Sequence, residues 1–263
     1  MELPNDINEL KQLVYTLIDE IVSLKTEVAT LKSQVASLEK ENAALRKENA
    51  RKASQISQTT KGLNIAFTGS LYKWHPIKLF LEEIENIMQQ NEDFAIHINF
   101  YGINEENFLR SLLTTLPKLQ TVCNIYPKTP NVILLENLAK NNVLLLFNDY
   151  SILGTKIFDY LAVRRHIILC FSEDEEALNL KKQYFPINDN HNLDKNLQEQ
   201  MILEKNGGTV IKNRKDLHIV LNNLLDEYNR TCNIACNSSH IEDVSRKYQT
   251  KLLVKFLLDT LKR

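Results

Sequence analysis

A strict seven-residue repeat governs the first fifty residues of the chain. Two sets of positions recur every seven residues, one mostly β-branched and the other made of leucine alone. They are Ile7, Val14, Ile21, Val28, Val35, Asn42 and Asn49, and Leu3, Leu10, Leu17, Leu24, Leu31, Leu38 and Leu45. This is the a and d pattern of a coiled coil, because a sevenfold repeat keeps one seam of a helix facing a partner helix. Residues 1–50 are therefore predicted to form one long helix that pairs with another chain.

The residue types in the seam predict how many helices pair. β-Branched residues at a with leucine at d favour two parallel strands, and asparagine at a helps to fix the register. In a parallel pair the repeat places Glu20 opposite Lys25 and Glu27 opposite Lys32. We expect a homodimer through residues 3–49, with a trimer as the main alternative.

The remainder of the chain follows a different pattern. Residues 51–61 have no periodicity and are rich in Ser, Thr, Gln and Lys, which predicts a linker. From residue 62 to residue 263, apolar runs of strand length alternate with longer amphipathic segments. Strands are expected at 63–69, 94–102, 122–127, 143–147, 166–171 and 209–213, and helices at 76–90, 104–116, 131–141, 154–163, 173–185, 214–229 and 238–262.

This alternation predicts the fold class. Strands that are apolar throughout are buried on both faces, and strands separated by helices pair in parallel. About 200 residues are enough for one such domain. The predicted fold is α/β: a Rossmann-like, doubly wound parallel sheet that follows an N-terminal coiled-coil helix.

Composition narrows the class of function. The 263 residues are 43% apolar and 25% charged, with a net charge of -1, so nothing indicates binding to nucleic acid. No run approaches the ~20 apolar residues that span a bilayer, and the N-terminus does not resemble a signal peptide, so we expect a cytoplasmic protein without a transmembrane segment. Cys232 and Cys236 lack the second ligand pair of a zinc site, and no metal is expected.

The loops that leave the carboxyl ends of the strands are the places to look for a ligand site. The first reads Thr68-Gly69-Ser70-Leu71-Tyr72-Lys73. Gly69 permits close approach of a ligand, Ser70 and the following amides could bind a phosphate, and Lys73 adds positive charge. The alternative is a tight turn without a ligand.

A second loop opens a helix with the residues Gly154-Thr155-Lys156-Ile157-Phe158-Asp159-Tyr160. Free N–H groups and a partial positive charge make a helix N-terminus a phosphate site. Thr155 could donate its hydroxyl, Lys156 could neutralise phosphate oxygens, and Asp159 could accept hydrogen bonds from a ribose. The alternative is that Thr155 only caps the helix, Lys156 is solvated and Asp159 offsets the helix dipole.

Four blocks occur in a characteristic order and spacing. They are "IAFTGSLYKWHPIKLFLEEI", "INFYG", "VILLENLAKNNVLLLFNDYSILGTKIFDYLAVRRHIILC" and "NGGTVIKNRKDLHIVLNNLL". Together they resemble the C-terminal, nucleotide-sugar-binding domain of retaining GT-B-fold glycosyltransferases that build bacterial polysaccharides. The resemblance covers about residues 62–263.

The resemblance implies a nucleotide-sugar as substrate, bound without a metal or other cofactor. Gly69 and Ser70 would meet the donor diphosphate, with Lys73 as the basic residue near it. Backbone around Tyr126 would contact the nucleobase. The start of the predicted helix completes the donor-binding residues. It would contribute Gly154, Thr155 and Lys156 near the diphosphate, and Asp159, in place of the usual Glu, near the ribose.

Two departures from the family pattern leave alternatives open. Ser151 stands where many members carry a further glutamate, and a coil precedes residue 62 where an acceptor-binding domain is expected. The chain could be a natural or engineered fusion, could work with a separate acceptor-domain chain, or could have lost catalysis. Glycosyl transfer is the predicted function; the alternative is a non-catalytic coiled-coil protein that carries a degenerate half.

Deletion of residues 1–50 is expected to convert a dimer into a monomer with unchanged nucleotide affinity. The seam residues that hold the pair together all lie within this segment. Light scattering coupled to size-exclusion chromatography measures the mass of both forms. A truncated chain that keeps the mass of a dimer would contradict the prediction.

Overall fold

The computed structural model describes residues 7–57, 62–186 and 196–260. The chain forms two compact units, Met1–Lys52 and Ala53–Arg263. Helix α1 runs over Ile7–Ser57, so residues 51–57 of the expected linker are helical. No glycine or proline interrupts this segment before Gly62, and its Ala, Arg, Lys and Gln residues favour helix. Residues 58–61, and Leu3 of the predicted seam, lie outside the described residues.

The apolar seam of α1 is exposed in the single chain. Its described a and d side chains are about half accessible, from 46% at Leu10 to 59% at Leu24. Solvent-exposed apolar side chains at this spacing gain free energy only when a second helix covers them.

A six-stranded parallel sheet forms the centre of the second unit, which confirms the predicted α/β, Rossmann-like fold. The strand order is β3-β2-β1-β4-β5-β6. The strands are β1 (Leu63–Thr68), β2 (Ile96–Tyr101), β3 (Cys123–Tyr126), β4 (Val143–Phe147), β5 (His166–Cys170) and β6 (Gly208–Ile211). All residues of β1 and β4 are buried, as expected for strands covered on both faces.

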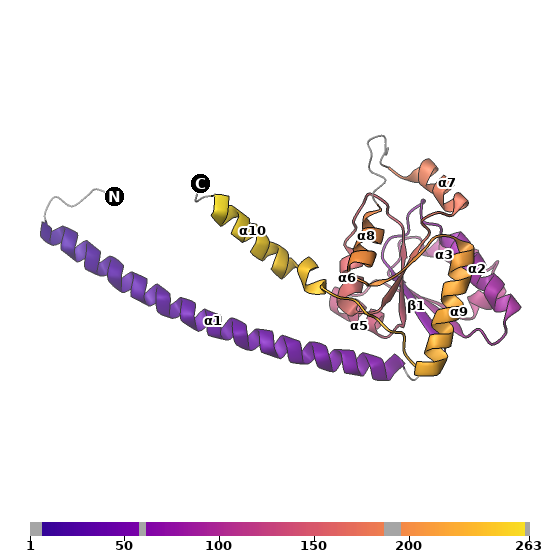
Figure 1. The fold of residues 1–263 in the computed structure, drawn as a ribbon, viewed down its shortest axis with the longest axis horizontal. Coiled ribbons are helices and arrows are strands. Elements are labelled where there is room, and N and C mark those ends of the chain that lie inside the picture. The colour runs from indigo at the N-terminus through magenta and orange to yellow at the C-terminus, as the bar shows by residue number, and fades with distance from the viewer. Residues whose placement is uncertain (1–6, 58–61, 187–195, 261–263) are drawn as a thin grey trace. The chain divides into compact units, whose positions relative to one another are not determined.

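Helices cover the two faces of the sheet as separate layers (Figure 1). One layer contains α2 (Ile77–Gln90), α3 (Glu106–Leu113), α4 (Pro117–Gln120) and α9 (Arg214–Thr231). The other contains α5 (Asn131–Ala139), α6 (Lys156–Val163) and α8 (Leu197–Glu204). The described chain also forms α7 (Glu175–Tyr184), the 3₁₀ turn η1 (Ile241–Val244) and α10 (Arg246–Thr260).

Three segments differ from the sequence expectation. The helix expected over 104–116 ends at Leu113, and α4 starts at Pro117, because proline fits the first turn of a new helix but not the interior of an old one. Helix α8 lies within a stretch expected to be irregular. The helix expected to begin at residue 238 begins at Arg246, after the turn η1.

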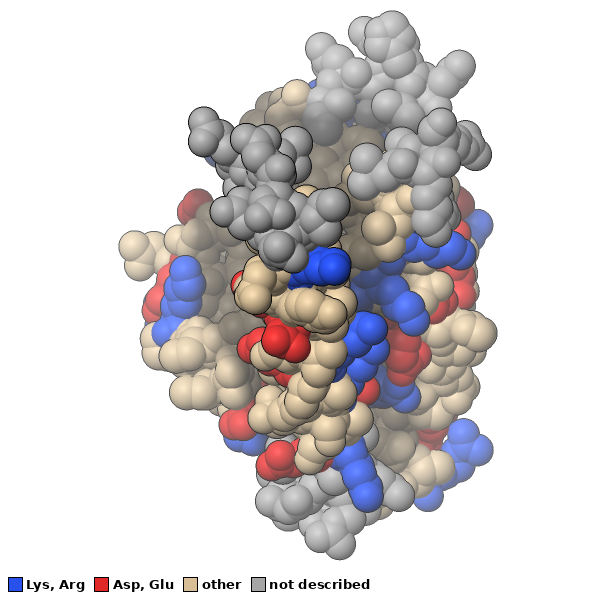
Figure 2. Space-filling model, turned by 90° about the vertical axis from the view of Figure 1, so that its left-hand side faces the viewer, with Lys and Arg blue, Asp and Glu red and all other residues tan. Residues whose placement is uncertain are grey.

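The surface carries both signs of charge. Figure 2 shows basic and acidic side chains interspersed on the face that it displays, without a continuous patch of one sign. No helix within the described ranges is both long and apolar enough to cross a bilayer.

Replacement of Gly208 by alanine is expected to destabilise the sheet by about 3 kcal/mol. A Cβ there would overlap the carbonyl oxygen of Ile167 and lie 2.6 Å from its backbone nitrogen, and a paired strand cannot move away. Gly154→Ala is the matched control, because its Cβ would meet only Asp149 Oδ2 at 3.8 Å. Urea unfolding measures both; equal free energies of unfolding for the two variants would contradict the prediction.

Candidate functional site

The candidate site lies where the strand order reverses, between β1 and β4. The two strands pair over only two residues each, Ile65–Ala66 with Val143–Leu144, although both continue beyond this point. The Thr68 N–H donates to the buried Tyr160 hydroxyl of α6, at 3.0 Å. The loops after β1 and β4 lead to helices on opposite faces of the sheet, and such a reversal is where open α/β sheets bind ligands.

Lys156, the first residue of α6, extends into this region. Its Nζ lies 4.0 Å from the centre of the Phe67 ring, at the end of β1. Burial lowers the pKa of Lys156 to about 8, and the negative charge of Asp149 opposes this shift. The ammonium is therefore poorly solvated and largely retained at neutral pH.

Gly69 makes room for the Lys156 side chain. Its φ is +83°, a conformation that favours glycine, and a Cβ there would lie 3.5 Å from Lys156 Cε and 3.9 Å from Nζ. The structure thus brings together two of the residues selected from the sequence, from loops 87 positions apart (156 minus 69).

Asp149 connects the loops around Lys156. Its Oδ1 accepts hydrogen bonds from His75 Nε2 at 2.9 Å and Trp74 Nε1 at 3.0 Å, and its Oδ2 accepts one from Gln198 Nε2 at 3.3 Å. The Tyr72 N–H donates to His75 Nδ1 at 3.2 Å, so the His75 proton is on Nε2. One carboxylate therefore joins the β1–α2 loop, the β4–α6 loop and α8.

The ionisation states of this pair follow from their surroundings. Burial lowers the pKa of His75, although Asp149 acts in the opposite direction, so the imidazole is neutral at pH 7. Burial alone would raise the pKa of Asp149, but hydrogen bonds from His75 and Trp74 and the nearby Lys156 hold it below its usual value. Asp149 is the anion of the site, with a side chain that is 13% exposed.

The N-terminus of α6 adds further positive potential. Thr155 occupies the cap position and is exposed, and its side chain makes no capping hydrogen bond. The Phe158 N–H donates to the Thr155 carbonyl oxygen at 3.1 Å, whereas the N–H groups of Lys156 and Ile157 receive no side-chain cap, and the helix start keeps its partial positive charge. Gly154, just before them, is half-buried.

Two buried polar atoms in the loop before α6 have no hydrogen-bond partner among the described residues. They are Asn148 Nδ2 and Ser151 Oγ. Buried donors and acceptors are almost always hydrogen-bonded in native proteins, so such atoms indicate a place where a ligand or water binds. Ser151 is the position at which the glycosyltransferase pattern has a glutamate.

Asp159 lies half-buried in the first turn of α6. Burial raises the pKa of Asp159, and the Arg246 guanidinium at the start of α10 opposes the shift.

Tyr126 ends β3 and stacks on Tyr101, with ring centres 4.9 Å apart and planes 12° apart. It is 41% exposed. Thr68, Tyr101 and Tyr126 share one register at the carboxyl ends of neighbouring strands. Two strand spacings, about 10 Å, separate Thr68 from Tyr126, so a ligand that reaches both must be extended along the sheet edge.

The structure does not bring Lys73 to the Lys156 side chain. Lys73 is exposed, and its Nζ lies 5.9 Å from the Tyr184 ring at the end of α7. Ser70 is half-buried in the turn after Gly69. Trp74 stacks on Tyr72 with ring centres 4.4 Å apart and donates its N–H to Asp149, so it supports the loop.

Sequence reasoning missed four residues of this arrangement. Asp149 lies two residues after the apolar run of β4, and its position at a strand end was an available signal. His75 and Tyr160 lie within stretches that had been noted without a role for these side chains. Gln198 gave no signal, because it is 49 residues away from Asp149 in the sequence.

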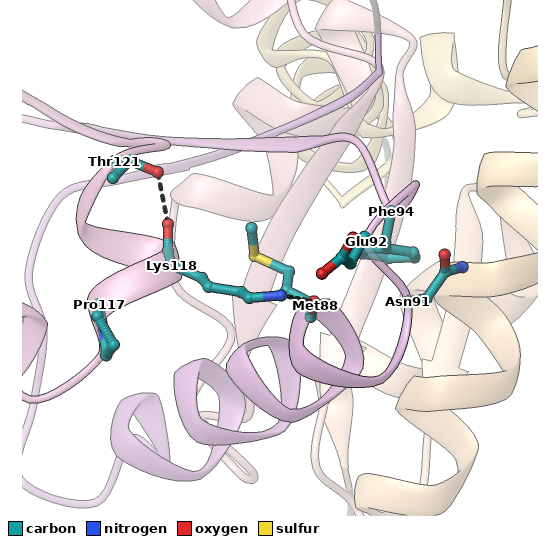
Figure 3. Close-up of a pocket in the computed structure, with 7 residues that line it drawn as sticks. All are labelled: Met88, Asn91, Glu92, Phe94, Pro117, Lys118 and Thr121. Carbon is teal, nitrogen blue, oxygen red and sulfur yellow. Dashed lines mark hydrogen bonds between the residues drawn. The ribbon is translucent and has the colours of Figure 1, made fainter.

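A surface pocket of about 430 Å³ lies elsewhere, between the end of α2 and α4 (Figure 3). It is lined by Met88, Asn91, Glu92, Phe94, Pro117, Lys118 and Thr121. The Lys118 ammonium donates to the Met88 carbonyl oxygen at 2.5 Å, which ties α4 to α2. The pocket is next to the loop that enters β2, at the amino ends of the strands, whereas the candidate site lies at their carboxyl ends. The Lys118 ammonium is already hydrogen-bonded to the Met88 carbonyl oxygen.

Comparison with family models gives no match to the sequence, and comparison with curated proteins gives none either. Comparison with solved structures gives several matches, of which three follow. HepE from Anabaena, solved with UDP-glucose, is 12% identical over 82% of this chain and 52% of its own, with a TM-score of 0.48. TarM from S. aureus is 13% identical over 76% of this chain and 35% of its own, with a TM-score of 0.46.

A third match is the C-terminal domain of LpcC, a glycosyl transferase group 1 family protein from Francisella tularensis. It is 13% identical over 69% of this chain and 93% of the domain, with a TM-score of 0.41. The chain thus spans about a third to a half of the length of TarM and HepE. At these identities the likeness concerns the fold alone.

Replacement of Lys156 by methionine is expected to stabilise the protein at pH 7 by about 1–2 kcal/mol. The folded-state pKa of about 8 is below the unfolded value, so the buried ammonium costs stability below pH 8. This cost decreases as the pH rises from 8 towards 10.5, and the two proteins should then converge. Urea unfolding at pH 7 and pH 10 measures the difference, with the exposed Lys78→Met as control; a less stable Lys156→Met at pH 7 would contradict the prediction.

Proposed function

We propose that the second unit binds a nucleotide-sugar and that its diphosphate lies at the N-terminus of α6. The observation that carries the proposal is the poorly solvated Lys156 ammonium, which meets Gly69 at the switch point between β1 and β4. The first-turn amides of α6 and this ammonium converge on one region, and glycine keeps a side chain out of it.

Charge balance supports an anionic ligand. A buried cation is stabilised by a partner of opposite charge, and Asp149 already accepts three hydrogen bonds from neutral side chains. A diphosphate brings more than one negative charge and several acceptor oxygens. Its oxygens could also accept hydrogen bonds from Asn148 Nδ2 and Ser151 Oγ, which lack a partner in the described residues.

Features along the sheet edge support a nucleotide over free phosphate. Asp159, one turn into α6, offers a carboxylate for the two hydroxyls of a ribose. Tyr126 is about 10 Å from the end of β1, at a distance that requires an extended ligand. The resemblance of residues 62–263 to donor-binding domains predicts the same orientation, with the base near Tyr126.

The chemistry that such a site serves is departure of a diphosphate. In glycosyl transfer the bond between the anomeric carbon and the diphosphate oxygen breaks and leaves its electron pair on that oxygen, while the oxygen of an acceptor hydroxyl bonds to the anomeric carbon and loses its proton. Lys156 and the α6 amides would stabilise the developing charge, which is the electrostatic contribution expected of an enzyme. An acceptor-binding half would come from a separate chain or from sequence beyond this one.

A second candidate function is non-catalytic: a coiled-coil protein that presents a donor-binding domain without transfer. The exposed apolar seam of α1 favours this function, because such a seam can serve association of chains without any catalysis by the attached domain. Ser151 at the position of a family glutamate is a further observation in its favour. Sugar transfer or hydrolysis by the purified chain, alone or with an acceptor-domain partner, would distinguish the two.

We expect the chain to bind a nucleotide diphosphate, and Lys156→Met to lose most of this affinity. UDP, GDP and TDP and their sugars are the probes, and ligand at 100 times its Kd should stabilise the wild type by about 2.7 kcal/mol. Affinity should decrease above about pH 8, because Lys156 loses its proton there. Calorimetry from pH 6 to 9.5 measures this, with Lys78→Met as control. Absence of binding by all three nucleotides, or equal binding by Lys156→Met, would contradict the proposal.

A further inference from the structure

Asp149 occupies a central place in the candidate site. Its carboxylate is held from two directions, by the β1–α2 loop through His75 and Trp74 and by α8 through Gln198. Gln198 also accepts a hydrogen bond from the Asp149 N–H at 2.8 Å, so backbone and side chain are both fixed. The β1–α2 loop that these bonds hold is the loop that carries Gly69.

The charged and titratable groups around Lys156 are few. Asp149 acts on it from the β4–α6 loop, and neutral His75 faces the same region from the β1–α2 loop. The other described neighbours are the Phe67 ring and Gly69 from β1 and its loop, and Gln198 from α8 contacts Asp149 without charge. Asp149 is thus the anion that favours the ammonium form of Lys156.

We propose, building on the proposed function, that Asp149 is a positioning residue of the diphosphate site. Its carboxylate fastens the glycine loop to the loop that precedes α6, and its charge keeps Lys156 cationic for the incoming anion. Both effects come from the Asp149 carboxylate, but they can be measured separately. The hydrogen bonds to the carboxylate fix the positions of the loops, and its negative charge favours the protonated form of Lys156.

If the residue at position 149 only held the loops together, an uncharged side chain with similar hydrogen bonds would be sufficient. Three neutral side-chain donors hold the carboxylate, and the oxygen of an amide side chain could also accept from them in part. The negative charge is useful at this place because a poorly solvated ammonium lies in the same region. A carboxylate near a cation raises its pKa, typically by about 1–3 units when the two are within a few ångströms.

The first experiment measures the ionisation of Lys156 in the full chain without any nucleotide. Competitive acetylation at a series of pH values, read by mass spectrometry, gives the pH midpoint at which Lys156 becomes reactive. In Asp149→Asn this midpoint is expected to fall by about one pH unit or more. Asp93→Asn removes an exposed carboxylate before β2, at the opposite sheet edge, and should leave the midpoint unchanged. A folded Asp149→Asn with the wild-type midpoint would overturn the charge part of the proposal.

The second experiment separates position from charge. Trp74→Phe keeps the ring on Tyr72 but removes one hydrogen bond to Asp149, whose charge remains. Its UDP affinity is expected to fall about fivefold, because one hydrogen bond that positions the loop is lost, with the Lys156 midpoint unchanged. Unchanged affinity would overturn the positioning part, and this variant decides alone if circular dichroism shows Asp149→Asn to be unfolded.

The two proposals fail in different ways. A wild-type chain that binds no nucleotide at any pH refutes the proposed function, and the positioning role falls with it. A wild-type chain that binds UDP, together with an Asp149→Asn variant whose Lys156 midpoint and upper pH limit of binding are both unchanged, refutes only the role of Asp149. A decrease in both the pH midpoint of Lys156 and the upper pH limit of UDP binding supports the positioning role of Asp149.

Discussion

The Lys156 ammonium over the Phe67 ring is the interaction on which the candidate site depends. Desolvation of a cation costs folding free energy, and the negative charge of Asp149 offsets part of this cost. The room that Lys156 occupies exists because β1 and β4 stop pairing after two residues each and because Gly69 has no side chain. Proteins tolerate such local cost mainly where function requires it.

The two units of the chain differ in how their apolar side chains are covered. The α1 helix exposes an apolar stripe in the single chain, whereas the sheet of the second unit buries its own strands between two helical layers. The switch point of the sheet supplies free amides, a cation and a glycine turn within one region. Pairing through α1 would bring two such domains into one particle without any change in the site.

Most of the fold follows from the pattern of apolar residues. The run of β4 is apolar throughout and that of β1 is mostly apolar, which identifies buried parallel strands, and the amphipathic segments between the strands identify the helices. The differences occur where local signals compete. The helix expected over 104–116 ends at Leu113, and a short helix that was not expected begins at Pro117. Helix α8 formed in a polar stretch because Ile202 is buried against the second layer, a tertiary contact that no local pattern records.

The sequence by itself determined the elements, the seam of the coil and the loops that reach the carboxyl edge, since each depends on residues close together along the chain. It also identified Gly69 and Lys156 as candidates. Only the tertiary structure decided that these two meet, that Lys73 turns towards Tyr184, and that Asp149 joins three segments. The reason is that contacts between distant loops depend on strand order and on where two strands separate, and neither property is encoded in local periodicity.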